Sequence, residues 1–211
     1  MVAAPDIVAS WKGEGMKEVT GKGYELKFHN VEVKNGAARY SGKRAWATLS
    51  AAVNHSLPAV TYELVVKPVP QEQLKRHKIT RCGVLYPKRN LMLEYYHGRW
   101  TLLLFERIIY DRIMGPKGAP EWTHVCVTTE KNIARLFVNG KEVKNGNGPL
   151  KSINDFGFTA PKGKISLNLG SLAHTWPNPY SFQGEIREFT IHGKALSPEE
   201  IAKLAAAKVK K

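Results

Sequence analysis

Residues 122–143 read WTHVCVTTEKNIARLFVNGKEV, and this stretch decides the fold of the chain. Apolar and polar residues alternate on both sides of an internal turn, which is the pattern of two strands that each bury one face. The second strand ends at Asn139-Gly140, a pair that favours a type I′ turn because both central residues of that turn need a positive φ. The stretch therefore predicts a pair of hairpins in the middle of an antiparallel sheet protein.

Similar strand-like segments recur along the whole chain, separated by glycine, proline and asparagine at the roughly 8–12-residue spacing that is typical of sandwiches and barrels. We expect strands at 24–28, 45–49, 60–66, 91–95, 100–105, 124–128, 134–138, 164–169 and 185–192. A chain of 211 residues with 43% hydrophobic content can form one substantial core, and no repeat or change in composition divides it. We therefore predict an all-β protein with a single domain over residues 1–211.

The clear helix signal lies at the C-terminal end, in the stretch ALSPEEIAKLAAAKVKK. Ser197 is the expected N-cap, Pro198 takes the first helical position, and Glu200 completes a capping box. We expect a helix over about 198–208. Its lysine-rich last turn suits the negative end of the helix dipole, and its apolar side can pack on the sheet through Ile201 and Leu204.

The chain carries 32 Lys and Arg residues against 18 Asp and Glu residues, which gives a net charge of +14. Such a charge attracts polyanions such as nucleic acid, anionic membrane surfaces or acidic proteins, and it is also compatible with a solvated, merely basic surface. No apolar run of 18 residues is present, so we expect no transmembrane helix.

The N-terminal stretch MVAAPDIVASWKGEG lacks the basic start and apolar segment of a secretory signal. We therefore expect an intracellular, cytoplasmic location, where Cys82 and Cys126 stay reduced instead of forming a disulfide. Neither cysteine has a partner at zinc-ligand spacing, so we expect no structural zinc.

Together these segments resemble the concanavalin A-like (laminin G-like) lectin and glucanase superfamily. The resemblance is carried by the hairpin at 121–143, by FQGEIREFTIHGKALSPEEIAKL at 182–204, and by the earlier segments GAARYSGKRAWATLS and TYELVVKPV. It extends from about Trp11 to Leu204. It implies a concanavalin A-like jelly-roll sandwich of two antiparallel sheets with a short C-terminal helix. Because this fold hosts lectins, hydrolases and adhesion modules, it does not specify a ligand.

Glycoside hydrolases of this superfamily carry a Glu-x-Asp-x-Glu strand, whose carboxylates act as nucleophile and general acid. The nearest match here is Glu185-Ile186-Arg187-Glu188, in which arginine replaces the middle aspartate. In a regular strand, Glu185 and Glu188 would point to opposite faces. We therefore expect no catalytic pair and no enzyme, and a glycan hydrolase is the third choice only because the superfamily contains them.

Metal and cofactor sites find no support in the sequence. The chain has only three aspartates, and they are widely spread. The sequence therefore shows no cluster of the several oxygen ligands that a calcium site needs. No two histidines lie two to four residues apart, and we expect His124 to be an exposed or half-buried strand residue. No phosphate-binding glycine loop is present, and we expect no cofactor.

The segment from Lys75 to Lys117 carries ten cations against three carboxylates, with tyrosines and Trp100 between them. On neighbouring strands these residues would suit phosphates and exposed bases, or an acidic protein. Alternatively, Tyr95 and Trp100 are core residues and the cations form a solvated face. The candidate polyanion-binding residues are Lys75, Arg76, Lys78, Arg81, Lys88 and Arg89.

A second candidate site is the proline-stiffened loop SLAHTWPNPYSF at 171–182. Aromatic rings can stack on the apolar faces of sugars, and a rigid loop lowers the entropic cost of binding. The candidate glycan-binding residues are His174, Trp176, Asn178 and Tyr180. Alternatively, Trp176 closes one end of the sandwich, because tryptophans are usually well buried.

The sequence thus leaves two binding hypotheses. The first is a non-catalytic recognition module, part of a larger assembly, that binds an anionic partner (an acidic protein or RNA) through a basic face. The second is a carbohydrate-binding lectin that uses the loop at 171–182. Neither hypothesis fixes the oligomeric state.

Overall fold

The structure is a computed structural model of the 211-residue chain. It describes residues 7–42, 44–49, 58–76, 81–86, 91–106, 109–117, 121–152, 167–171 and 181–209. We call its two antiparallel sheets sheet A and sheet B. Sheet A contains β1 (Ile7–Lys12), β2 (Lys17–Glu18), β4 (Val31–Lys34), β5 (Ala37–Ser41), β7 (Ala59–Pro68), β12 (Thr123–Glu130), β13 (Ile133–Val138), β14 (Lys141–Glu142), β15 (Leu150–Lys151) and β17 (Gln183–His192). Sheet B contains β3 (Leu26–His29), β6 (Trp46–Leu49), β8 (Arg81–Tyr86), β9 (Leu91–Tyr96), β10 (Arg99–Glu106), β11 (Ile109–Lys117) and β16 (Asn168–Leu169).

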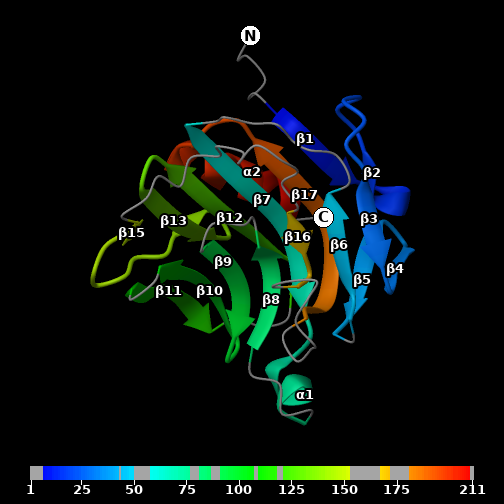
Figure 1. The fold of residues 1–211 in the computed structure, drawn as a ribbon, viewed down its shortest axis with the longest axis horizontal. Coiled ribbons are helices and arrows are strands. Elements are labelled where there is room, and N and C mark those ends of the chain that lie inside the picture. The colour runs from blue at the N-terminus through cyan, green and yellow to red at the C-terminus, as the bar shows by residue number, and fades with distance from the viewer. Residues whose placement is uncertain are drawn as a thin grey trace.

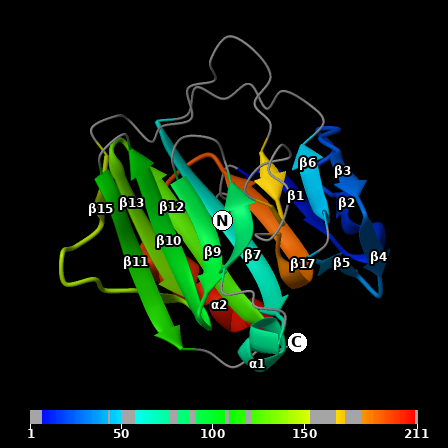
Figure 2. The same cartoon turned by 60° about the horizontal axis from the view of Figure 1, so that its bottom comes forward.

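The two sheets face each other as the layers of a sandwich (Figures 1 and 2). The main path of sheet A runs β14-β13-β12-β7-β17-β1-β2, with β5 and β4 added beside β17, and sheet B runs β11-β10-β9-β8-β16-β6-β3. Strands that are neighbours in a sheet, such as β17 and β7, lie far apart in the sequence, as expected of a jelly roll. The predicted all-β sandwich of two antiparallel sheets is confirmed.

The core between the sheets follows the predicted alternation along the opening hairpin. Val125, Val127 and Leu136 are at most 1% exposed and belong to the main apolar cluster. The turn at Asn139-Gly140, which follows β13, also has its predicted conformation, since these two residues have φ values of 49° and 79°. The residues that the alternation places on one face of each strand therefore do face the core, but β12 is also buried on its outer face, where Cys126 packs beneath α2.

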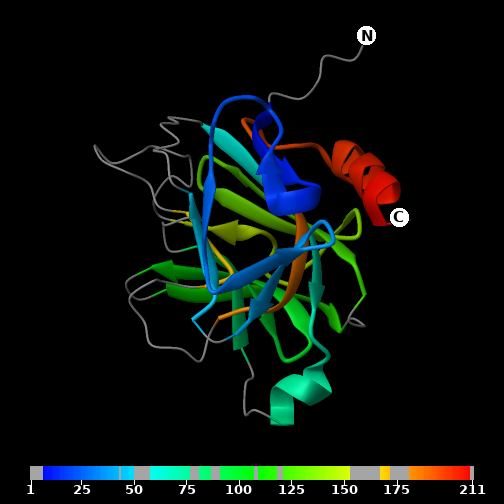
Figure 3. The same cartoon turned by 90° about the vertical axis from the view of Figure 1, so that its right-hand side faces the viewer.

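Among the described residues, two α-helices and the short 3-10 helix η1 (Glu14–Met16) accompany the sandwich, and only the longer α-helix was predicted. The helix α2 (Pro198–Val209) has the expected capping box, because the N–H of Ser197 donates to Glu200 Oε2 over 2.8 Å and the N–H of Glu200 donates to Ser197 Oγ over 3.3 Å. The short helix α1 (Gln71–Arg76) begins after Pro70, whose carbonyl accepts the N–H groups of Gln73 and Leu74. Figure 3 shows α2 on the outside of the sandwich and α1 at its lower end.

The helix α2 covers part of the outer face of sheet A. Ile201 and Leu204 pack there, as predicted, in a small apolar cluster with Cys126, Phe137 and Leu196 that is separate from the main core. In contrast, Cys82 lies in the main core between the sheets. Both cysteines are free, as expected; they are also buried, and they lie in different clusters. No helix among the described residues is long and apolar enough to cross a membrane.

The strand β17 contains an irregularity that the sequence analysis missed. Its register against β7 shifts between Ile186 and Glu188, so Arg187 is the extra residue of a β-bulge. Ile186 and Phe189 both face the core. Glu185 and Glu188 therefore both lie on the outer face of sheet A, and the prediction that they point to opposite faces is wrong because it assumed a regular strand.

Candidate functional site

A polar groove crosses the outer face of sheet A where β4, β5, β17 and β7 run side by side. Its cavity volume is about 520 Å³, which is within the usual range for small-ligand sites. Most of its lining residues are charged or carry amides, and the rest are small or apolar apart from Tyr40. The lining residues are Asn30, Glu32, Arg39, Tyr40, Ser41, Lys67, Pro68, Val69, Pro70, Gln73, Gln183, Gly184 and Glu185.

The floor of this polar groove carries a row of alternating charges. Glu32 pairs in register with Arg39, Arg39 with Glu185, and Glu185 with Lys67, so that four strands contribute one residue each. All four point outward, because their chain neighbours, such as Ala38 and Ile186, belong to the core. We call these four residues the charged row.

Within the part of the chain that the structure describes, none of the side chains in the charged row forms a hydrogen bond or an ion pair. Glu185 and Lys67 are half-buried, whereas Glu32 and Arg39 are exposed. The two carboxylates can accept hydrogen bonds, and the guanidinium and ammonium groups can donate them. The charged row thus offers both kinds of partner to a molecule in the groove.

Backbone packing brings the strands of the groove close together. Gly184 has a φ of 150°, and a Cβ at this position would lie 2.3 Å from the carbonyl oxygen of Lys67 and 2.9 Å from the Cα of Pro68. Because both distances are far below van der Waals contact, only glycine lets β17 approach β7 here. Any side chain at this position would push apart the two strands that carry Glu185 and Lys67.

Amides and prolines complete the walls of the polar groove. Gln73 reaches the groove from α1, where Leu74 is buried and anchors the helix. Gln183 precedes Gly184, and Pro68 and Pro70 form an apolar stretch of wall next to Lys67. A wall of this kind can contact the C–H face of a sugar ring while the charged row and the amides bind its hydroxyl groups. The lining includes the aromatic residue Tyr40, whose ring packs in the core beside Phe182. The sequence pattern did not reveal this site.

The residues predicted from the sequence are only partly placed by the structure. His174, Trp176, Asn178 and Tyr180 lie outside the described residues, as do Lys78, Lys88 and Arg89. Lys75 and Arg76 belong to α1, the helix whose Gln73 lines the polar groove, and Arg81 begins β8, opposite Tyr96. The structure therefore places two of the predicted cations on a helix that borders the groove.

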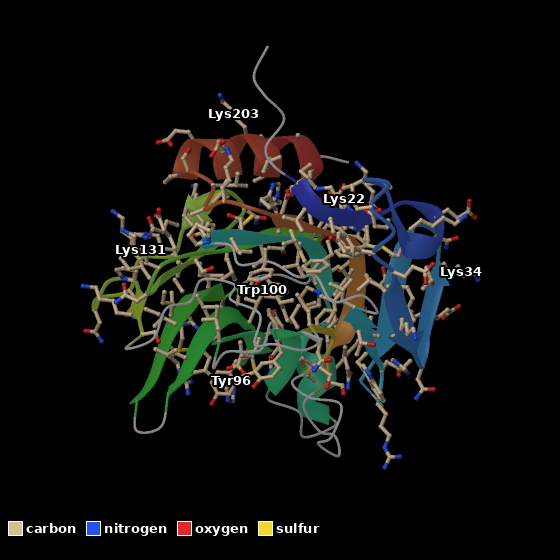
Figure 4. The ribbon with its side chains drawn as sticks, turned by 45° about the horizontal axis from the view of Figure 1, so that its top comes forward. Lys22, Lys34, Tyr96, Trp100, Lys131 and Lys203 are labelled. Atoms are coloured by element: carbon tan, nitrogen blue, oxygen red, sulfur yellow. The ribbon has the colours of Figure 1, made fainter. Side chains whose placement is uncertain are left out.

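The aromatic residues of the basic segment divide between core and surface. Tyr95 and Trp100 are 2% and 3% exposed, and their ring centroids lie 5.1 Å apart within the core. The interpretation that they stack on bases is wrong, because both face the opposite sheet. Tyr96 is half-buried, and the guanidinium carbon of Arg112 lies 5.1 Å from its ring centroid. Figure 4 shows Trp100 in the interior and Tyr96 nearer the edge of the sandwich.

Four exposed lysines of the described residues lie apart from one another. Lys22, Lys34, Lys131 and Lys203 lie toward different sides of the sandwich (Figure 4). Arg99 donates a hydrogen bond to the carbonyl oxygen of Gly115 over 3.0 Å. These four lysines therefore do not form a single basic face.

A buried ionic network lies beneath α2, in the middle of sheet A. The carboxylate of Glu63 lies 2.9 Å from His124 Nε2, 2.8 Å from His192 Nε2 and 2.7 Å from Lys208 Nζ. Lys208 Nζ also lies 2.9 Å from the carboxylate of Glu188. His124 is fully buried, so the prediction of an exposed or half-buried residue is wrong, because α2 covers the outer face of the sheet at this point.

The partners of Glu63 determine its charge state. Burial alone would raise the pKa of Glu63, but the hydrogen bonds from His124 and His192 and the charge of Lys208 outweigh burial and hold that pKa well below its usual range. Burial alone would lower the pKa of Lys208, but Glu63 and Glu188 outweigh it and raise that pKa. Both groups are therefore charged at neutral pH, and they join α2 to the sheet.

Comparisons with known proteins agree with this description. Residues 114–202 match the family model of the concanavalin A-like lectin/glucanases superfamily. A comparison with curated protein sequences finds no match. The fold class inferred from the sequence is thus confirmed, and the chain has the architecture of a lectin-like jelly-roll domain.

Several solved structures share this fold. The chain is similar to the binding domain of botulinum neurotoxin serotype D, with 14% identity and a TM-score of 0.69 over 96% of this chain and 51% of that one. The serotype D ligand binding domain in complex with N-acetylneuraminic acid gives 14% identity, a TM-score of 0.68 and the same coverages. The receptor binding domain of botulinum neurotoxin type G gives 12% identity, a TM-score of 0.64, and again 96% and 51% coverage. The chain spans about half the length of these structures, and at such identities the likeness shows the fold alone.

Proposed function

We propose that this chain is a non-catalytic, lectin-like recognition module that binds a glycan in the polar groove. The observation that carries the proposal is the charged row, whose four side chains have no partner among the described residues and lie in a cavity of about 520 Å³. The lectin-like fold supports the proposal, as does the similar domain determined with N-acetylneuraminic acid. The chain matches about half of that domain, so the groove's own residues carry the proposal.

The same residues favour binding over catalysis. Glycosidases use two carboxyl groups that flank the bond to be cleaved, one of them as a general acid. In the charged row, Arg39 stands between Glu32 and Glu185, and Glu188 is held by Lys208 at 2.9 Å. The closing strand also lacks the middle aspartate of the hydrolase motif. A cation between two carboxylates suits hydrogen bonding to hydroxyl groups, not general acid–base chemistry.

The proposal is tested by screening the protein on a glycan array and titrating each hit by calorimetry against two groove variants. Arg39→Ala and Glu185→Gln each remove a charge-assisted hydrogen bond, so each should weaken binding about tenfold or more. Lys131→Ala is the matched control, because Lys131 is exposed and lies in the turn between β12 and β13, away from the groove. Binding that survives both groove variants but is lost in Trp176→Ala or Tyr180→Ala would place the site on the loop at 171–182 instead.

A second candidate function is binding of an anionic macromolecule, either an acidic protein or RNA. The net charge of +14 favours it, and so does the presence of Lys75 and Arg76 on α1, the helix whose Gln73 lines the groove. We propose an intracellular, cytoplasmic location together with this function, which imaging of the tagged protein in its own cells would check. The signature of this function is an affinity that falls steeply with salt.

A further inference from the structure

The strand β17 connects the polar groove with α2. Glu185 belongs to the charged row, Arg187 is the extra residue of the bulge, and Glu188 contacts the helix. These residues follow one another along a single strand. A change in the conformation of the bulge therefore affects the groove and the helix contact at the same time.

Lys208 of α2 contacts both Arg187, the extra residue of the bulge, and Glu188, which follows it. Arg187 donates a hydrogen bond to the carbonyl oxygen of Lys208, and its guanidinium carbon lies 4.7 Å from the ring centroid of Trp122. Glu188 pairs with the ammonium group of the same lysine at 2.9 Å. The last turn of α2 thus contacts the bulge through both a backbone carbonyl and a side chain.

Lys208 is also the link between α2 and the buried ionic network. Its ammonium group lies 2.7 Å from Glu63, which in turn holds His124 and His192. The apolar contact of α2 with the sheet is a small cluster, separate from the main core. Because a buried carboxylate that loses a partner is costly, removal of Lys208 should release the last turn of the helix.

The bulge matters because a strand alternates its faces with a period of two residues. A shift of the register by one residue moves side chains from one face of the sheet to the other. With Arg187 bulged, Glu185 points into the groove while Ile186 and Phe189 both stay in the core. Without the bulge, Glu185 and Ile186 could not keep their present faces while Glu188 and Phe189 keep theirs.

We propose that α2 is a latch that holds the Arg187 bulge and thereby keeps Glu185 oriented in the polar groove, so that undocking of α2 weakens ligand binding there. This inference rests on the proposed function for its ligand, but the latch itself can be measured without one. Coupling between two sites is reciprocal, so a ligand in the groove should in turn favour the docked helix.

The two cysteines provide a readout of the latch. Cys126 lies beneath α2, and Cys82 lies in the main core; both are fully buried. Burial raises the pKa of both thiols, so each should react slowly with a thiol reagent until it becomes exposed. Labelling of Cys126 alone reports opening of the helix, whereas labelling of both thiols reports opening of the whole sandwich.

The test compares Lys208→Met with the control Lys203→Met, which removes an exposed lysine from the same helix. In Lys208→Met, we expect Cys126 to label at least about tenfold faster and Cys82 at the parent rate, while the affinity of a glycan found on the array falls by a comparable factor. Lys203→Met should match the parent in all three measurements. If Lys208→Met exposes Cys82 as well, the milder Glu188→Gln replaces it, because that variant keeps the contact between Lys208 and Glu63.

Each outcome bears on the latch separately from the proposed function. Faster labelling of Cys126 in Lys208→Met with unchanged glycan affinity would overturn the coupling. Unchanged labelling of Cys126 in both Lys208→Met and Glu188→Gln would overturn the latch. If the parent binds no glycan at all, the proposed function fails. Hydrogen exchange at the backbone amides of 183–188 then decides, with faster exchange in Lys208→Met supporting the latch and parent-like exchange refuting it.

Discussion

The carboxylate of Glu63 shows how a single buried charge shapes this fold. It is surrounded by two histidine nitrogens and the Lys208 ammonium group, all within 2.9 Å. Replacing such a network by apolar residues is often neutral or stabilising, whereas removing one partner leaves an uncompensated buried charge. We infer that Glu63 specifies where α2 docks more than it adds to the net stability of the protein.

Glu63→Gln should destabilise the protein by about 3–5 kcal/mol at neutral pH, the usual effect of breaking a buried ion pair. The pKa of Glu63 is lower in the folded protein than in the unfolded chain. Its contribution is therefore fully present above the unfolded pKa, about 4.3, and it is lost as the pH falls through the lower, folded pKa. Urea midpoints from pH 3 to pH 7 should show a gap between parent and variant that narrows only below about pH 4.3. A gap of constant size would mean that the carboxylate is not charged in the folded protein.

At the scale of the element, the hairpin of β12 and β13 is a rigid support for both the core and α2. Leu136 faces inward and is fully buried, while Phe137, its neighbour, faces α2. The hairpin therefore packs on both of its faces, as does β17 beside the bulge. Such elements define the sandwich, whereas α2 adds to it from outside.

Leu136→Ala should cost about 2–5 kcal/mol, as for other fully buried leucines. The matched control is Ile133→Ala in the same strand, because Ile133 is only half-buried and should cost less. Urea unfolding followed by tryptophan fluorescence measures both variants. An unchanged midpoint for Leu136→Ala would show that the inward face of β13 has been assigned incorrectly.

At the scale of the whole molecule, the net charge of +14 and the polar groove predict different salt dependences. If the chain binds RNA, each phosphate that it neutralises contributes a slope of about −0.7 to the logarithm of affinity against the logarithm of salt for single strands. Changing Arg76, Lys78, Lys88 and Arg89 together to glutamate should then abolish the electrophoretic shift, while Trp176→Ala should leave it intact. Glycan binding in the groove should change little over the same salt range. Equal salt dependence for both ligands, unaffected by the fourfold variant, would contradict this division of sites.

Features set by local sequence could be predicted, and those set by long-range contacts could not. The Asn139-Gly140 turn and the Ser197 capping box need only a few adjacent residues, and both are confirmed. The orientation of Glu185 depends on a bulge that no local sequence pattern predicted. The burial of His124 depends on a helix more than 70 residues further along the chain.

The charged row was missed for a related reason. Its four members come from four strands, and Glu32 and Glu185 are separated by most of the chain. The one available signal was the alternation in TYELVVKPV, which places Lys67 on the face opposite the inward Val66. A site built across a sheet becomes visible only when the order of the strands is known.

The packing of α2 on the hairpin turn makes one position a marker for comparing related sequences. A Cβ at Gly140 would lie 2.9 Å from the Cα of Ala202 and 3.1 Å from the Cβ of Ala205. Any other residue at this turn therefore forces the helix outward, quite apart from the strain of its positive φ. A relative that keeps glycine at position 140 and small residues at positions 202 and 205 can pack its helix against the turn. A relative with larger residues at these positions must place its helix elsewhere on the sheet. Inspecting these three columns of an alignment would sort such relatives by helix position before any of their structures is determined.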